Sequence, residues 1–288
     1  MKPVAFDYCR PDSVAEATAL LHELGGDAVL LAGGMSLGPM LNMRLVRPSV
    51  VVDINAIGGL DKISRNGAVM IGATTRQADV LADESVLGEV PLLAAMLPHV
   101  GHFQTRNRGT FGGSIAHADP SAEIPLALVT LGGEVELTAR CGTRRVPAAE
   151  FFQGMLMTMR QPDEMITALY FPRRQPQSGY AFSEVAQRRG DFAITAVACA
   201  VTLGNDNNIT QLRLGLGGIE DRPILADTSS FNGQSADSAL ATAIAAEISE
   251  RLEPMEDIAA SATYRRALAR SLSHNVLEQA FQQARAVG

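Results

Sequence analysis

Two pairs of adjacent glycines constrain this chain more than any other feature. The first, Gly33-Gly34, ends the apolar run 28–31 and precedes a predicted short helix at 37–44, the pattern of a strand that turns directly into a helix. Because glycine has no Cβ, such a turn lets backbone N–H groups approach an anion, and the following helix N-terminus favours negative charge. Phosphate is the natural ligand, although a tight turn without a ligand is the simpler interpretation of this pair alone.

The second pair, Gly112-Gly113, lies in the segment 101–125, which we expect to be a long irregular loop because it is polar and rich in glycine. Arginines and hydroxyl side chains accompany the pair. Its backbone amides could donate to a second phosphate, or to a diphosphate shared with the first turn, and Glu123 could accept hydrogen bonds from sugar hydroxyls. The alternative is a surface loop that binds nothing.

The composition argues against several classes of function. Lysine and arginine total 24 against 31 acidic residues, a formal charge of -7, which argues against a nucleic-acid surface. The three cysteines lie too far apart in sequence for the short spacings of iron–sulfur or zinc ligands, and their odd number is typical of a reducing compartment. We find no apolar run suited to a signal peptide or a membrane span, and therefore expect a cytoplasmic protein.

Other familiar motifs are incomplete. The segment 215–220 lacks the last glycine of the Rossmann dinucleotide fingerprint, and there is no P-loop. His99, His102 and His117 could share a metal, but the glycine-rich sequence around them gives no reason for the three to converge. Ser114 lacks the strand–Gly-x-Ser-x-Gly–helix context of a nucleophile. The sequence thus predicts no catalytic residue and no metal ligand in this chain.

The chain divides into three predicted segments. Residues 1–57 alternate strands and helices, residues 58–175 add a hairpin at 66–67 with further strands and short helices, and the stretch 172–179 is the expected linker. The rest begins with strands, at 180–187, 193–203 and 209–217, and ends with helices, at 236–252 and 261–285. Strands followed by helices indicate an α+β class.

Taken together, the motifs resemble those of one family. They are, in chain order, Ala32-Gly33-Gly34-Met35-Ser36-Leu37, Ile71-Gly72-Ala73-Thr74-Thr75, Arg106-Asn107-Arg108-Gly109-Thr110-Phe111-Gly112-Gly113-Ser114 and His117-Ala118-Asp119-Pro120. In this order and spacing they resemble the FAD-binding medium subunit of molybdenum hydroxylases, the family of carbon monoxide dehydrogenase, xanthine dehydrogenase and N-heterocycle oxidoreductases. The resemblance covers nearly the whole chain.

The resemblance implies an α+β fold with a two-subdomain FAD-binding domain of the vanillyl-alcohol-oxidase type. The subdomains would be residues 1–57 and 58–175, followed by a C-terminal α+β domain, residues 176–288, with an antiparallel sheet and helices. Noncovalent FAD would lie in the cleft, with its diphosphate against both glycine turns.

It also implies which residues lie at the cofactor. They are Leu30, Leu31, Ala32, Gly33, Gly34, Met35, Ser36 and Leu37 in the first turn, Thr110, Phe111, Gly112, Gly113 and Ser114 in the second, and Asp119, Glu123, Ile166 and Phe192 elsewhere. Of the last group, Glu123 would be an acidic residue on the cofactor, Ile166 would lie beside the adenine and Phe192 would approach the isoalloxazine. Two residues depart from the usual pattern: Met35 replaces a glutamine, and Glu184 stands where lysine is common.

The resemblance finally implies partners. A small subunit would carry two [2Fe-2S] clusters and a large subunit the molybdopterin cofactor, in a dimer of heterotrimers. This chain would pass electrons from the clusters through FAD to an external acceptor. One alternative is a stand-alone FAD-dependent oxidase or reductase of the same fold, and another is a flavin-free assembly protein.

Overall fold

The N-terminal part of the chain is a small parallel sheet with helices, seen in a computed structural model that describes residues 1–286. The strand order is β1 (Asp7–Cys9), β3 (Val50–Asp53), β2 (Ala28–Leu31), and the helices are α1 (Val14–Leu24), the 3-10 turn η1 (Gly25–Asp27) and α2 (Leu37–Asn42). At the start of α1, the Ser13 hydroxyl accepts a hydrogen bond from the Glu16 N–H at 3.2 Å, and the Glu16 carboxylate accepts one from the Asp12 N–H at 2.9 Å. Strand β2 runs directly into Gly33-Gly34, as predicted.

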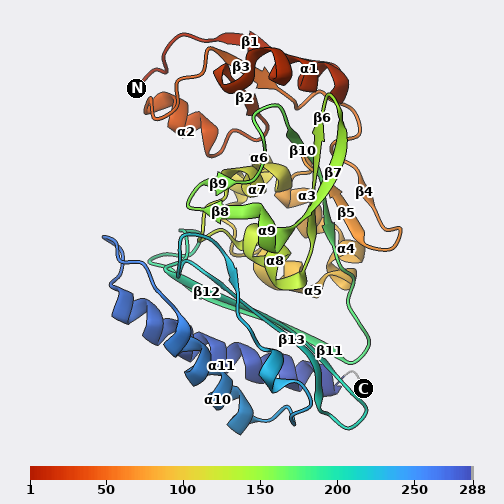
Figure 1. Cartoon of the computed structure of the whole chain (residues 1–288), viewed down its shortest axis with the longest axis vertical. Coiled ribbons are helices and arrows are strands. Elements are labelled where there is room, and N and C mark those ends of the chain that lie inside the picture. The colour runs from red at the N-terminus through yellow and green to blue at the C-terminus, as the bar shows by residue number, and fades with distance from the viewer. Residues whose placement is uncertain (287–288) are drawn as a thin grey trace.

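The middle part is a five-stranded antiparallel sheet covered by short helices (Figure 1). The strand order is β4 (Ile63–Ser64), β5 (Val69–Gly72), β10 (Met165–Phe171), β6 (Glu134–Ala139), β7 (Gly142–Pro147), and a separate hairpin pairs β8 (Phe152–Gly154) with β9 (Met157–Thr158). The helices are α3 (Gln77–Ala82), α4 (Glu84–Glu89), α5 (Pro91–Met96), α6 (Phe103–Arg108), α7 (Phe111–His117), α8 (Glu123–Leu131) and α9 (Ala148–Phe151). Apolar side chains of this sheet and of α5, α7 and α8 form the largest core cluster.

The prediction of an irregular loop at 101–125 is wrong, because α6, α7 and the start of α8 occupy most of this segment. The Thr110 hydroxyl caps α7 by accepting a hydrogen bond from the Gly113 N–H at 3.1 Å. Phe111 and Ile115, four residues apart on one helical face, are fully buried. The glycine content concealed this apolar pair, and the second glycine pair therefore lies in the first turn of a helix.

The C-terminal part is a four-stranded antiparallel sheet with helices on one face. Its strands, in spatial order, are β11 (Ser178–Val185), β12 (Thr195–Leu203), β13 (Ile209–Gly217) and β14 (Ile224–Leu225), followed by the 3-10 turn η2 (Ser229–Phe231) and by α10 (Ser238–Arg251) and α11 (Ala262–Ala286). Helix α11 packs on β11 and β12, whereas α5 and α8 of the middle part pack on the opposite face (Figure 1). The predicted strands and helices of this part are confirmed, and no helix among residues 1–286 is long and apolar enough to cross a bilayer. The boundaries at 57/58 and 175/176 stay a prediction.

Arg265 links the last helix to the sheet, and we expect its loss to destabilise the chain. Its side chain is buried, and the guanidinium donates to the Gly218 carbonyl at 2.6 Å, to the Asp257 carboxylate at 2.7 Å and to the Ile194 carbonyl. Arg265→Met leaves two buried carbonyls without these donors, so the free energy of unfolding should fall by about 3 kcal/mol in urea titrations. Arg270→Met, an exposed arginine on the same helix, is the control and should change it by less than about 0.5 kcal/mol. Equal losses in both variants would contradict the assignment.

Candidate functional site

The first glycine turn lies against the segment that leads into the second. A Cβ added to Gly33 would meet the Arg108 carbonyl oxygen at 2.2 Å and the Gly109 Cα at 3.1 Å. The first turn therefore packs directly on the backbone that leads into Thr110 and helix α7. Two segments far apart in sequence thus meet at one place, and only glycine at position 33 permits this close approach.

The first turn holds a run of backbone donors without acceptors. Among the described residues, the N–H groups of Gly33, Gly34, Met35 and Ser36 donate to no protein oxygen. Gly34 has φ +74, in the left-handed region, which turns the chain sharply before α2. Neighbouring N–H groups that are free of partners form a concave donor set for phosphate oxygens. This turn therefore fits the diphosphate of FAD.

The second turn differs from the sequence expectation. The Phe111 N–H donates to the Thr75 carbonyl at 3.1 Å, and the Gly112 N–H donates to the Ala73 carbonyl at 2.8 Å. The N–H groups of Gly113 and Ser114 both donate to Thr110, at 3.1 Å each. The amides that we expected to bind phosphate are thus already used within the protein. Of the two turns, only the first therefore has free amides.

The motif Ile71-Gly72-Ala73-Thr74-Thr75 supports the second turn. Besides accepting the two hydrogen bonds from α7, it lies so close that a Cβ on Gly112 would meet the Ala73 Cβ at 2.6 Å. The Gln77 N–H, just beyond the motif, donates to the Gly109 carbonyl at 3.0 Å. The motif therefore positions the second turn, which explains why it occurs together with the two glycine pairs.

Sequence reasoning missed two residues that bridge the turns, Asn55 and Arg76. The Asn55 side-chain amide donates to the Ala32 carbonyl at 2.8 Å, and Arg76 donates to the Arg108 carbonyl at 2.6 Å. Neither belongs to a glycine pair. The one signal in the sequence is that each lies just after an apolar strand, where side chains project from the end of a sheet.

A buried acidic cluster lies at the N-terminus of α8. Glu123 is only 6 % exposed, and burial raises its pKa to about 8, with smaller contributions from the charges of Glu184 and Asp119 and opposition from Arg106. Glu184, on β11, has one carboxylate oxygen 3.0 Å from His99 Nδ1 and the other buried without a hydrogen-bond partner among the described residues. Burial raises the pKa of Glu184 as well, against the effect of His99. Glu123 is thus a neutral carboxyl group near pH 7 that can donate one hydrogen bond.

The other predicted site residues are more scattered. Phe192 is 59 % exposed and follows Gly190, whose added Cβ would meet His102 Cε1 at 2.7 Å. Asp119 accepts a hydrogen bond from the Ser121 N–H at 2.9 Å. Ile166 is buried in the middle core, whereas Leu30, Leu31 and Leu37 are half-buried. The structure therefore brings the segments of the two turns together. The roles of Ile166 and Phe192 at the cofactor stay predictions.

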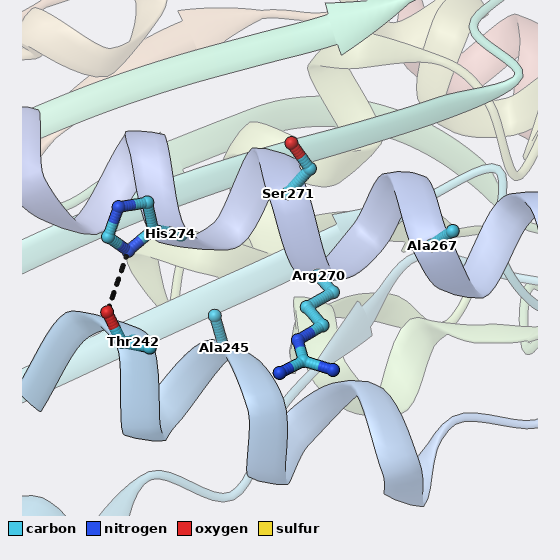
Figure 2. A pocket seen from close by; sticks show the side chains of 6 residues that line it. All are labelled: Thr242, Ala245, Ala267, Arg270, Ser271 and His274. Atoms are coloured by element: carbon cyan, nitrogen blue, oxygen red, sulfur yellow. Dashed lines mark hydrogen bonds between the residues drawn. The ribbon is translucent and has the colours of Figure 1, made fainter.

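Two further features lie outside this site. Within residues 1–286, no three His, Cys, Asp or Glu side chains converge as metal ligands. An open groove between α10 and α11 is lined by Thr242, Ala245, Ala267, Arg270, Ser271 and His274 (Figure 2). It lies on the helical layer of the C-terminal part, across the sheet from α5 and α8.

Two protein-family models together match almost the entire chain. Residues 4–174 match the model of the FAD binding domain in molybdopterin dehydrogenase, and residues 180–280 match the CO dehydrogenase flavoprotein C-terminal domain. Together the two models leave only the termini and a short connection unmatched.

Individual relatives agree with these matches. The chain is 36% identical to the 6-hydroxypseudooxynicotine dehydrogenase complex subunit alpha of Paenarthrobacter nicotinovorans, over 99% of this chain and 97% of the relative. It is 34% identical to the carbon monoxide dehydrogenase medium chain of Hydrogenophaga pseudoflava, over 98% and 99%. Its structure resembles that of quinoline 2-oxidoreductase from Pseudomonas putida 86 with a TM-score of 0.93, at 34% identity and covering 99% of each chain.

Proposed function

The chain belongs to the FAD-binding medium subunits of the molybdenum hydroxylases, and on this premise we propose how its residues hold FAD and with which partners it works. The observation that carries the proposal is the run of unpartnered N–H groups at Gly33–Ser36, packed against the segment that leads into α7. Such a donor set matches the oxygens of a diphosphate.

The proposed cofactor contacts follow from this geometry. The diphosphate lies on residues 32–36, with the wall of Thr110–Ser114 on its other side. The proposed lining residues are those predicted from the family resemblance: Leu30, Leu31, Leu37, Asp119, Glu123, Ile166 and Phe192 in addition to the two turns. Glu123, as a neutral carboxyl group, donates a hydrogen bond as well as accepting one, which suits sugar hydroxyls.

The chain's own residues then bind and orient the cofactor. When bound, FAD supplies a carrier that accepts electrons singly and releases them singly or in pairs. No side chain of this chain is proposed to act as a general acid, base or nucleophile. The protein contributes position, exclusion of water and the electrostatic environment of the flavin.

The proposed partners are a small subunit with two [2Fe-2S] clusters and a large subunit with the molybdopterin cofactor, assembled as a dimer of heterotrimers. Support comes from the relatives, which are described as a medium chain and as a subunit of a dehydrogenase complex. We place the complex in the cytoplasm, because Cys9, Cys141 and Cys199 are free thiols.

The test is electron transfer from the small subunit. The FAD-loaded chain is mixed anaerobically with the chemically reduced small subunit, and the flavin absorbance is followed by stopped flow. We expect bleaching of the flavin and reoxidation on adding an acceptor. The stand-alone oxidase alternative predicts no reduction by the small subunit, and a chain purified without any flavin would contradict the cofactor site itself.

A further inference from the structure

We propose that Arg76 is a positioning residue for the FAD diphosphate, because its guanidinium ties the two glycine turns together and directs its positive charge to the bound anion. The inference rests on the proposed diphosphate site. It assigns a role to a residue outside both glycine pairs.

A continuous set of hydrogen bonds runs through Arg76 from one turn to the other. One guanidinium NH2 group donates to the Arg108 carbonyl at 2.6 Å, the same oxygen on which Gly33 packs. The other donates to the Asn55 side-chain oxygen at 2.8 Å. The Asn55 amide nitrogen in turn donates to the carbonyls of Ala32 at 2.8 Å and Leu31 at 3.3 Å. Arg76 therefore connects the entry of the first turn to the entry of the second.

Asn55 is held in the orientation that this connection needs. Its backbone N–H donates to the Asp53 carboxylate at 2.9 Å, and its side-chain amide nitrogen donates to the same oxygen at 2.6 Å. The second oxygen of that carboxylate accepts a hydrogen bond from the Tyr8 hydroxyl at 2.5 Å. Because the amide nitrogen is fixed toward Asp53 and Ala32, the amide oxygen must face Arg76.

The charge of Arg76 has no direct counter-ion among the described residues. Among residues 1–286, no carboxylate lies within 4.0 Å of its guanidinium; Asp53 and Asp79 attract it only from farther away. Burial lowers the pKa of Arg76, and the like charge of Arg108 lowers it further. The half-buried guanidinium of Arg76, with the like charge of Arg108 nearby, is stabilised by an anion. The diphosphate supplies that charge where the two turns meet.

The experiment measures FAD affinity in the full-length chain, stripped of flavin and titrated with FAD by flavin fluorescence at several salt concentrations. We expect Arg76→Met to weaken FAD binding roughly 10- to 100-fold and to reduce its salt dependence. Asn55→Ala, which keeps the charge, should weaken it less and leave the salt dependence unchanged. Because both residues act in one set of hydrogen bonds, the double variant should lose less than the product of the two factors. Arg173→Met, at the surface ion pair with Glu89, is the control and should bind FAD as the wild type does.

Two conservative variants separate charge from folding. Arg76→Lys keeps the charge and should retain the salt dependence and part of the affinity, whereas Arg76→Gln should bind like Arg76→Met. The free energy of unfolding of each flavin-free variant is measured in parallel. If Arg76→Met fails to fold, the comparison of Arg76→Lys with Arg76→Gln takes its place. Equal affinity and equal salt dependence in Arg76→Lys and Arg76→Gln, or unchanged affinity in Arg76→Met, would overturn the proposal. Those outcomes leave the flavin site intact, whereas a wild-type chain that binds no FAD would overturn the site as well.

Discussion

Gly33→Ala should abolish the retention of FAD. The added Cβ would lie 2.2 Å from the Arg108 carbonyl oxygen, and backbone on both sides cannot yield as a flexible side chain would. Relief requires the first turn to move away from the segment that leads into α7, which would remove the proposed wall of the diphosphate site. Forcing a methyl group into a packed contact costs about 1–3 kcal/mol in the folded chain, and loss of the bound ligand lowers its apparent stability further. We expect FAD affinity to fall at least roughly 100-fold.

The measurement is the ratio of flavin to protein after gel filtration, together with the melting temperature at a fixed FAD concentration. Gly38→Ala is a matched control, because it makes the same chemical change in helix α2, where an added Cβ meets nothing within 4 Å. It should retain FAD and gain about 0.5–1 kcal/mol of stability, since alanine favours helix over glycine. Gly33→Ala with a full complement of flavin would mean that the contact between the turns is dispensable.

The sequence alone was sufficient to locate both turns but not to place their donors. Gly33-Gly34 follows a strand, and that local pattern is visible in the residue order. The amides of Phe111 and Gly112 are not free, because they donate to the carbonyls of Thr75 and Ala73. Those partners belong to another strand end, and only the packed sheet brings them within hydrogen-bond distance. A local pattern cannot reveal such long-range pairing.

The same distinction explains the error at 101–125. The composition of this segment is that of a loop, yet Thr110 as a helix cap and the buried pair Phe111 and Ile115 determine its structure. Conversely, β12 and β13 were predictable, because the apolar run of β12 and the alternating apolar residues of β13 are local signals. For the bridge through Asn55 and Arg76 the only local signal was a position after an apolar strand, which does not reveal a role that depends on what lies opposite.

Glu123 should make the chain less stable as the pH rises from about 4.5 to about 8. Burial raises the pKa of this carboxyl from 4.5 to about 8, so between these values the folded chain holds a proton that the unfolded chain has released. The stabilisation is therefore complete below the unfolded pKa and is lost as the pH rises through the folded one. At about 1.4 kcal/mol per pH unit, the loss from this group reaches up to about 5 kcal/mol. The raised pKa of Glu184 acts in the same direction.

The measurement is the free energy of unfolding in urea at pH values from 5 to 8.5, at a fixed FAD concentration. Glu123→Gln replaces the carboxyl by a neutral group of the same shape, so most of the pH dependence should disappear and the variant should equal or exceed the wild type at pH 8. Glu84→Gln, at an exposed position in α4, is the control and should follow the wild-type profile. If the wild type keeps the same stability over this range, or if Glu123→Gln retains the wild-type slope, then Glu123 is ionised near neutral pH. It would then only accept hydrogen bonds from a sugar, and its proposed role as a donor would be wrong.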